Sequence, residues 1–87
     1  MVDVETTSSE ELVRVRFSAD AGVTRIYFEP MGTEFRLALH DQIQLELPLG
    51  DVRDLEIHVV DDGVAVWLTH GNEHGVLDKD GNLIERI

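Results

Sequence analysis

Apolar and polar residues alternate over much of the chain, a pattern typical of β-strands with one buried face. The longest example spans residues 55–68, where two alternating segments flank Asp62-Gly63. That dipeptide favours a two-residue hairpin turn, because Gly adopts positive φ freely and Asp tolerates it. The resulting register places His58 opposite Trp67 on one face. The other face is aliphatic and is expected to point to the core; it consists of Leu55, Ile57, Val59, Val66 and Leu68.

Two segments in the N-terminal half predict further strands of the same kind. Residues 12–17 and 23–29 each alternate between apolar and polar side chains. In the second segment, Ile26 and Phe28 are expected to face the core while Tyr27 faces solvent. In the first segment, the apolar positions are Val13, Val15 and Phe17, and the polar positions are Arg14 and Arg16.

The alternating segment at residues 33–39 is expected to form hairpins with the strands on both sides of it. With a turn at Pro30-Met31-Gly32-Thr33, its upstream register places Phe28 opposite Phe35. With a short loop at its other end, its downstream register places Arg36 opposite Glu46. Opposite charges directly across an antiparallel pair contribute about 0.2–1 kcal/mol, so this register is electrically favourable.

The remaining chain predicts a connector and a last hairpin. Pro48 cannot donate to a sheet, so Pro48 to Asp54 is expected to carry the chain across to a second sheet or round a barrel corner. Near the C-terminus, Gly81 is expected to take the left-handed position of a three-residue loop. That loop places Leu77 opposite Leu83.

These elements together predict an all-β fold with little or no helix. Residues 1–11 carry four acids, no base and little apolar surface, so we expect a disordered acidic arm. Residues 12–87 are expected to form a single domain of about seven or eight short strands built from consecutive hairpins. A small antiparallel sandwich and a small barrel fit this pattern equally well.

The charge of the chain changes the range of expected partners. Eighteen acidic residues against seven basic residues give a formal net charge of −11. Such a field repels phosphate backbones, so we expect no binding to nucleic acid or to anionic membranes. It attracts a basic protein partner. The alternative, that the acidity serves only solubility or adaptation to a salty or acid-biased cytoplasm, stays open.

Cysteine content and terminal sequence bear on the compartment. The chain has no cysteine, which fits a reducing environment. No apolar run approaches the roughly 20 residues of a membrane span. The N-terminal residues show no basic region followed by an apolar core, so we do not expect a secretory signal. The sequence therefore predicts a cytoplasmic protein.

Two short strings suggest metal chemistry, but neither predicts a site. His70, Glu73 and His74 match an H-x-x-E-H spacing, which needs a helix to bring both imidazoles to one face. Here the motif lies between expected strands, so a polar loop is the favoured interpretation. Asp78 opens a series of alternating oxygen ligands that resembles the start of a calcium loop. Because the later ligand positions are missing, we expect a turn, and no metal or cofactor.

No nucleophile elbow or phosphate-binding loop is present, so we do not expect an enzyme. The sequence favours a non-catalytic interaction module, of the adaptor, inhibitor or immunity type, that docks a basic protein. Trp67, His58 and Tyr27 are the candidate binding residues, because all three lie on expected solvent faces. If another layer covers that face, Trp67 is instead a core residue. A small barrel that binds a ligand or metal, and a homodimer or larger oligomer joined through edge strands, are the alternatives.

Overall fold

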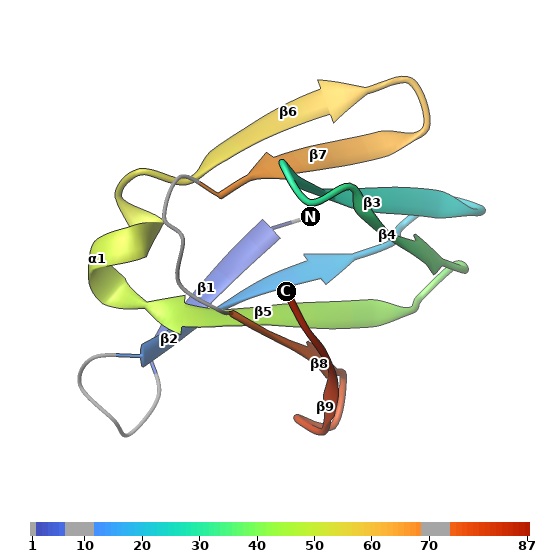
Figure 1. Ribbon diagram of the computed structural model, residues 1–87. Coiled ribbons are helices and arrows are strands. Elements are labelled where there is room, and N and C mark those ends of the chain that lie inside the picture. The colour runs from blue at the N-terminus through green and yellow to red at the C-terminus, as the bar shows by residue number, and fades with distance from the viewer. Residues whose placement is uncertain (1, 7–11, 69–73) are drawn as a thin grey trace.

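The computed structural model of the chain describes residues 2–6, 12–68 and 74–87, with residues 3–6 described by their backbone (Figure 1). Nine strands and one short helix make up this part of the chain. The elements, in order, are β1 (Val2–Thr6), β2 (Leu12–Ser18), β3 (Thr24–Glu29), β4 (Thr33–Leu37), β5 (Gln42–Pro48), α1 (Leu49–Val52), β6 (Glu56–Val60), β7 (Gly63–Trp67), β8 (Gly75–Asp78) and β9 (Leu83–Arg86).

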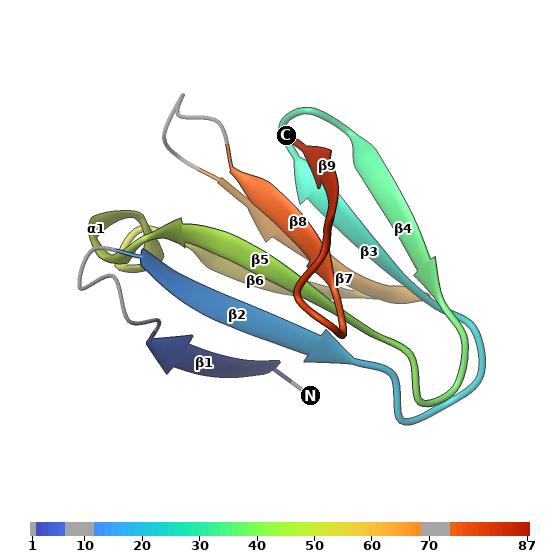
Figure 2. The same ribbon diagram turned by 90° about the horizontal axis from the view of Figure 1, so that it is seen from below.

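The strands form two sheets that face each other. One sheet has the order β1-β2-β5-β8-β9 and the other has the order β4-β3-β7-β6. The two views in Figure 1 and Figure 2 show them as separate layers joined by crossing connections. The predicted all-β fold is therefore confirmed, and of the two predicted architectures the protein adopts the sandwich.

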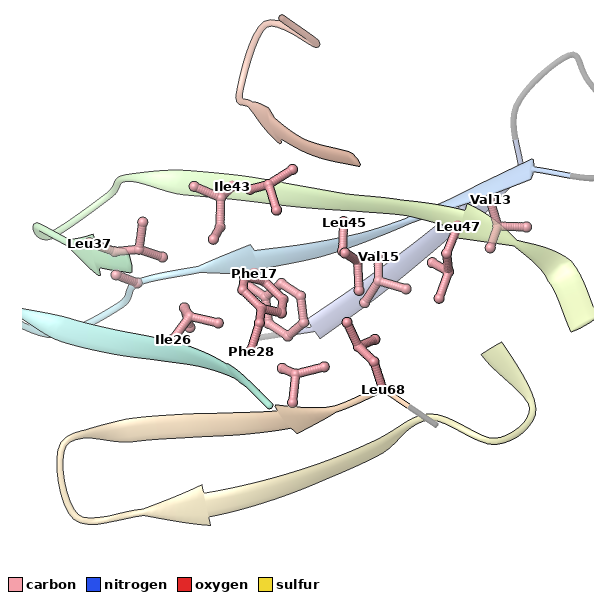
Figure 3. Packing of buried hydrophobic residues seen from close by; sticks show 13 residues of the cluster. Val13, Val15, Phe17, Ile26, Phe28, Leu37, Ile43, Leu45, Leu47 and Leu68 are labelled. Atoms are coloured by element: carbon pink, nitrogen blue, oxygen red, sulfur yellow. The ribbon is translucent and has the colours of Figure 1, made fainter. Parts of the chain in front are cut away.

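The core fills the space between the layers with side chains from the inward faces of both sheets. Phe17 of β2 and Phe28 of β3 lie together between the sheets (Figure 3). Their rings meet edge to face with centroids 6.2 Å apart. Phe35 of β4 extends this aromatic contact, with its centroid 5.8 Å from that of Phe28. The inward positions predicted for β2 and β3 are confirmed, since all five of those apolar residues are buried: Val13, Val15, Phe17, Ile26 and Phe28.

Strand β1 lies in the segment for which we expected disorder. Residues 2–6 pair with β2 in an antiparallel register that aligns Val2 with Phe17 and Val4 with Val15. The backbone of β1 pairs with the edge of β2 that β5 does not occupy, so the edge of β2 is protected. The expectation of disorder is wrong for this strand. The rest of the expected arm, residues 1 and 7–11, lies outside the described residues.

The β6–β7 hairpin forms as predicted, but its turn is one residue earlier. Asp61 and Asp62 form the turn, and Val60 lies opposite Gly63. The register therefore differs by two residues from the predicted one. Each side chain keeps its predicted face of the sheet, but its partner on the opposite strand changes. The predicted pairing of His58 with Trp67 is wrong, since His58 lies opposite Ala65.

The glycine at position 63 of β7 has a steric reason. Strand β7 pairs in parallel with β3, and Gly63 aligns with Arg25. A Cβ atom at position 63 would overlap the Arg25 carbonyl oxygen. Gly63 is therefore required by a close approach of two strands rather than by the hairpin turn.

The expected pairing around β4 is also corrected. Ile26, rather than Phe28, lies opposite Phe35, again a shift of two residues that keeps the faces. The predicted hairpin between β4 and β5 does not form, because the connection after β4 crosses to the other sheet. Glu46 of β5 lies opposite Arg14, with their side chains 3.1 Å apart, and not opposite Arg36.

The connector and the last hairpin follow the predictions. Residues 48–54 contain helix α1 and carry the chain from β5 in one sheet to β6 in the other. In the last hairpin, Leu77 lies opposite Leu83, and Gly81 has a φ of 86° as its left-handed position requires. The described chain contains no helix with the length and apolar character needed to cross a membrane.

Candidate functional site: the outer face of the four-stranded sheet

The outward side chains of the β4-β3-β7-β6 sheet form one continuous surface, which we call the outer face. Strand β7 pairs with β3 on one side and with β6 on the other. Residues paired across strands project to the same side of the sheet, so each set of paired residues forms a row of side chains across the surface. One row runs from Tyr27 through Ala65 to His58, and the next from Glu29 through Trp67 to Glu56. The complete outer face consists of Arg25, Tyr27, Glu29, Glu34, Arg36, Glu56, His58, Val60, Gly63, Ala65 and Trp67.

All three predicted binding residues lie on this face. Trp67 ends β7 with 42% of its surface exposed, so it is not a member of the buried core. Tyr27 and His58 flank Ala65 in the adjacent row, on strands about 9.6 Å apart. The sequence predicted the outward direction of each residue, and the β3–β7 pairing brings them onto one surface.

A shallow concavity lies beside these aromatic residues. Ala65 is small and buried between larger side chains, so the surface is lower at its position than around it. The concavity has a volume of about 480 Å³, and its walls carry three carboxylates. The lining residues are Tyr27, Glu29, Val60, Asp61, Asp62 and Ala65.

A hydrogen-bonded group fixes the position of Tyr27. Its hydroxyl donates to Asp62 Oδ2 at 2.7 Å, and Arg25 Nη1 donates to the same oxygen at 3.4 Å. The hydrogen bond to Asp62 is the main cause that raises the pKa of Tyr27 above its ordinary value. The pKa of Arg25 is raised by its hydrogen bond with Tyr27 and by its attraction to Glu34. Arg25 and Glu34 approach to 3.4 Å.

The electrostatic balance around the concavity is negative. Arg25 already contacts both Asp62 and Glu34. Within residues 12–68 and 74–87, Glu29 and Asp61 have no ion pair with an Arg or Lys. These two carboxylates stand on the rim of the concavity and give it an excess of negative charge.

The edge strand β6 borders the outer face and differs from the expected core strand. Its five residues are all exposed. Val59 is 87% exposed and Ile57 is 38% exposed, so our expectation that both belong to the core is wrong. Both project to the inward side of the sheet, but Figure 1 shows β6 as the strand of this sheet farthest from the other layer. The opposite sheet does not cover them.

On the outward side of β6, His58 is bonded to a neighbouring acid. Its Nε2 lies 3.0 Å from Glu56 Oε1, and both side chains are more than half exposed. This pair leaves the imidazole at the surface beside the aromatic row. His58 can therefore take part in binding a partner without leaving a buried polar group unpaired.

The structure describes only one residue of the H-x-x-E-H motif, His74. His70 and Glu73 lie outside the described residues. His74 is only 2% exposed, and its Nε2 lies 3.0 Å from Asp51 Oδ2 of helix α1. This contact fastens the start of β8 to the connector. In the described part of the chain, no three His, Asp or Glu side chains are placed to hold a metal ion.

The calcium-like string forms the turn that we expected. Asp78 Oδ1 accepts hydrogen bonds from the backbone N–H groups of Asp80 and Asn82, each at 2.9 Å. These bonds lower the pKa of the Asp78 carboxyl, and the bond from Asn82 has the largest effect. The side chain of Asp78 thus stabilises the β8–β9 hairpin.

Comparisons of the chain with protein-family models, with curated proteins and with solved structures found no match. The outer face is therefore interpreted from its own geometry and charge. Its distinguishing features are an exposed tryptophan, a tyrosine fixed by Asp62, and a carboxylate-rimmed concavity between the two strands that carry Tyr27 and Val60.

Proposed function

We propose that the protein is a non-catalytic interaction module that docks a basic protein partner on the outer face. The observation that carries this proposal is the exposure of Trp67 beside a concavity rimmed by Glu29, Asp61 and Asp62. A surface that combines a large aromatic side chain with one sign of charge is suited to a partner of the opposite charge.

The exposed tryptophan supplies the anchor. Tryptophan is enriched among the few interface residues that contribute most of the binding free energy. Trp67 is the only tryptophan of the chain, and the core is closed without it. Covering its exposed surface with a partner removes apolar area from water at about 25 cal/mol per Å².

The carboxylates determine which partner fits. A Lys or Arg side chain that enters the concavity meets Glu29 and Asp61, and its apolar stem passes over Tyr27 and Ala65. An Arg guanidinium can also stack on an exposed aromatic ring, which contributes about 0.5–1 kcal/mol at exposed sites. The formal charge of −11 further steers a basic protein toward this surface.

The bonding of the ionisable groups supports a non-catalytic role. Tyr27 and Arg25 are held by carboxylates at the surface, and His58 is held by Glu56. These contacts orient side chains for recognition. None of them joins a nucleophile to a base in a water-excluded site, which is the arrangement that covalent catalysis requires.

An NMR titration tests the proposal. A ¹⁵N-labelled chain is titrated with a pool of short basic peptides, and separately with a pool of short acidic peptides of equal length. We expect the basic pool to shift the Trp67 indole N–H resonance and the amides of residues 25–29 and 63–67. Shifts that are absent, or equal for both pools, or confined to the five-stranded sheet, would contradict it.

A further inference from the structure

We propose that the partner contributes an extended segment that adds as a new strand along the free edge of β6. The segment alternates apolar and basic residues. This inference rests on the proposed function, because it specifies how the basic partner binds. It is drawn from the exposure of β6, the direction of its side chains and the position of the concavity.

Strand β6 has one edge with which no strand of the described residues pairs. It pairs with β7 on one side and is the last strand of its sheet on the other. Exposed edges are normally protected by an inward-pointing charge, a proline or a bulge. The inward positions of β6 are Ile57 and Val59, its sequence contains no proline, and its register with β7 is regular. The edge is thus open to pairing.

The edge at the other end of the same sheet is different. There, inward-pointing Leu37 of β4 is only 4% exposed, because the opposite sheet covers it. Val59 of β6, with 87% exposure, has no such cover. Apolar side chains from an added strand can therefore pack against Ile57 and Val59 and extend the core beyond its present limit.

The outward positions of an added strand meet a different environment. A strand lies about 4.8 Å from its neighbour, and its side chains alternate between the two faces. Those on the outward side come to lie beside Glu56 and Val60, near the turn that carries Asp61 and Asp62. Basic side chains at these positions can reach the concavity. The chemistry of β6 thus selects apolar residues inward and basic residues outward.

Charge favours a basic partner over a second copy of this chain. An antiparallel pair of β6 strands related by a two-fold axis at His58 would align Asp54 of each chain with Asp62 of the other. It would also bring together two chains that each carry a formal charge of −11. Like charges directly opposite destabilise a strand pair. A basic segment avoids both costs.

A peptide of alternating Val and Lys is the probe. Its controls are a peptide of the same composition with the Val and Lys residues in two blocks, and an alternating peptide of Val and Glu. We expect the Val-Lys alternating peptide to bind most tightly. We also expect binding to slow hydrogen exchange of β6 amides that are exposed in the free protein.

Two variants place a charge at Val59, an inward-facing position of β6. Val59→Lys and Val59→Glu are both expected to weaken binding about tenfold or more, because an inward charge blocks strand addition. Using both signs separates this effect from simple attraction or repulsion. Since Val59 is exposed, both variants should fold normally. Ile84→Lys, on the exposed edge strand β9, is the matched control and should bind like the wild type.

The possible results separate this inference from the proposed function. If the peptide binds at Trp67 while β6 amides and the Val59 variants behave as in the wild type, the partner docks without adding a strand and the inference is wrong. Equal binding of the alternating and block peptides also overturns it. A homodimer that Val59→Lys disperses assigns the edge to a second copy instead. If no basic peptide binds, the proposed function fails as well.

Discussion

The hydroxyl of Tyr27 donates a hydrogen bond to Asp62 Oδ2 at 2.7 Å, which joins β3 to the turn between β6 and β7. These residues are far apart in sequence, and the parallel pairing of β3 with β7 brings them together. The contact fixes one wall of the concavity. It also links the ionisation of a single group to the structure of the outer face.

This contact predicts an alkaline titration. Tyr27 is the only tyrosine, so its ionisation can be followed directly by tyrosinate absorbance. Its pKa should lie above the ordinary value of about 10, and Asp62→Asn should lower it toward that value. Because the folded pKa is raised, the stabilising contribution is present below pH ~10 and is lost as pH rises through the folded pKa. A Tyr27 pKa that Asp62→Asn leaves unchanged would contradict the hydrogen-bond assignment.

Gly63 provides a test of the strand pairing. Gly63→Ala should destabilise the fold by about 1–3 kcal/mol or more, because the added methyl group overlaps the Arg25 carbonyl oxygen. Gly50→Ala in α1 is the control, since nothing lies within 4 Å of its added Cβ. Chemical denaturation measures both. Equal stability of the two variants would show that β3 and β7 do not approach as described.

Much of the fold follows from alternation, and its errors have a common physical cause. A strand pattern repeats every two residues, so a slip of two keeps every side chain on its face. The sequence therefore predicted the outward directions of Tyr27, His58 and Trp67, while the partner of His58 was wrong. The alternating pattern excludes only registers shifted by an odd number of residues, because these move every side chain to the opposite face.

The remaining errors involve contacts between distant segments. The sequence of β5 does not reveal that Arg14 of β2, rather than Arg36 of β4, lies opposite Glu46, since both candidates alternate in the same way. Exposure of Val59 depends on how far the other sheet extends, which no local pattern records. A glycine inside a strand was the one available signal for the close approach at Gly63, and we assigned it to the turn.

Acid stability should depend on Asp78. Backbone hydrogen bonds lower its folded pKa, so its stabilising contribution is present above the unfolded value of about 3.9 and is lost as pH falls through the folded pKa. Asp78→Asn should therefore reduce the slope of stability against pH below about pH 4. Denaturation at a series of acidic pH values measures this slope. An Asp78 carboxyl that titrates at its ordinary pKa by NMR would refute the account.

Trp67 should contribute little to folding. With 42% of its surface exposed, Trp67→Ala is expected to cost well under the ~3–5 kcal/mol of a buried aromatic. Phe28→Ala is the contrast, because Phe28 is fully buried and should show that larger cost. Quenching of the single tryptophan by a water-soluble quencher provides a second measurement. Emission that resists quenching, with severe destabilisation of Trp67→Ala, would place the side chain in the core.

The most direct test of the docking surface is the dissociation constant of one basic peptide from wild type and from Trp67→Ala. The peptide is taken from the basic pool, and Ile84→Ala, which removes an exposed apolar side chain on β9, is the control. If Trp67 anchors the partner, its truncation should weaken binding about thirtyfold, the lower bound for such anchors, while Ile84→Ala has no effect. Equal dissociation constants for all three proteins, with folding intact, would contradict the assignment of the outer face as the docking surface.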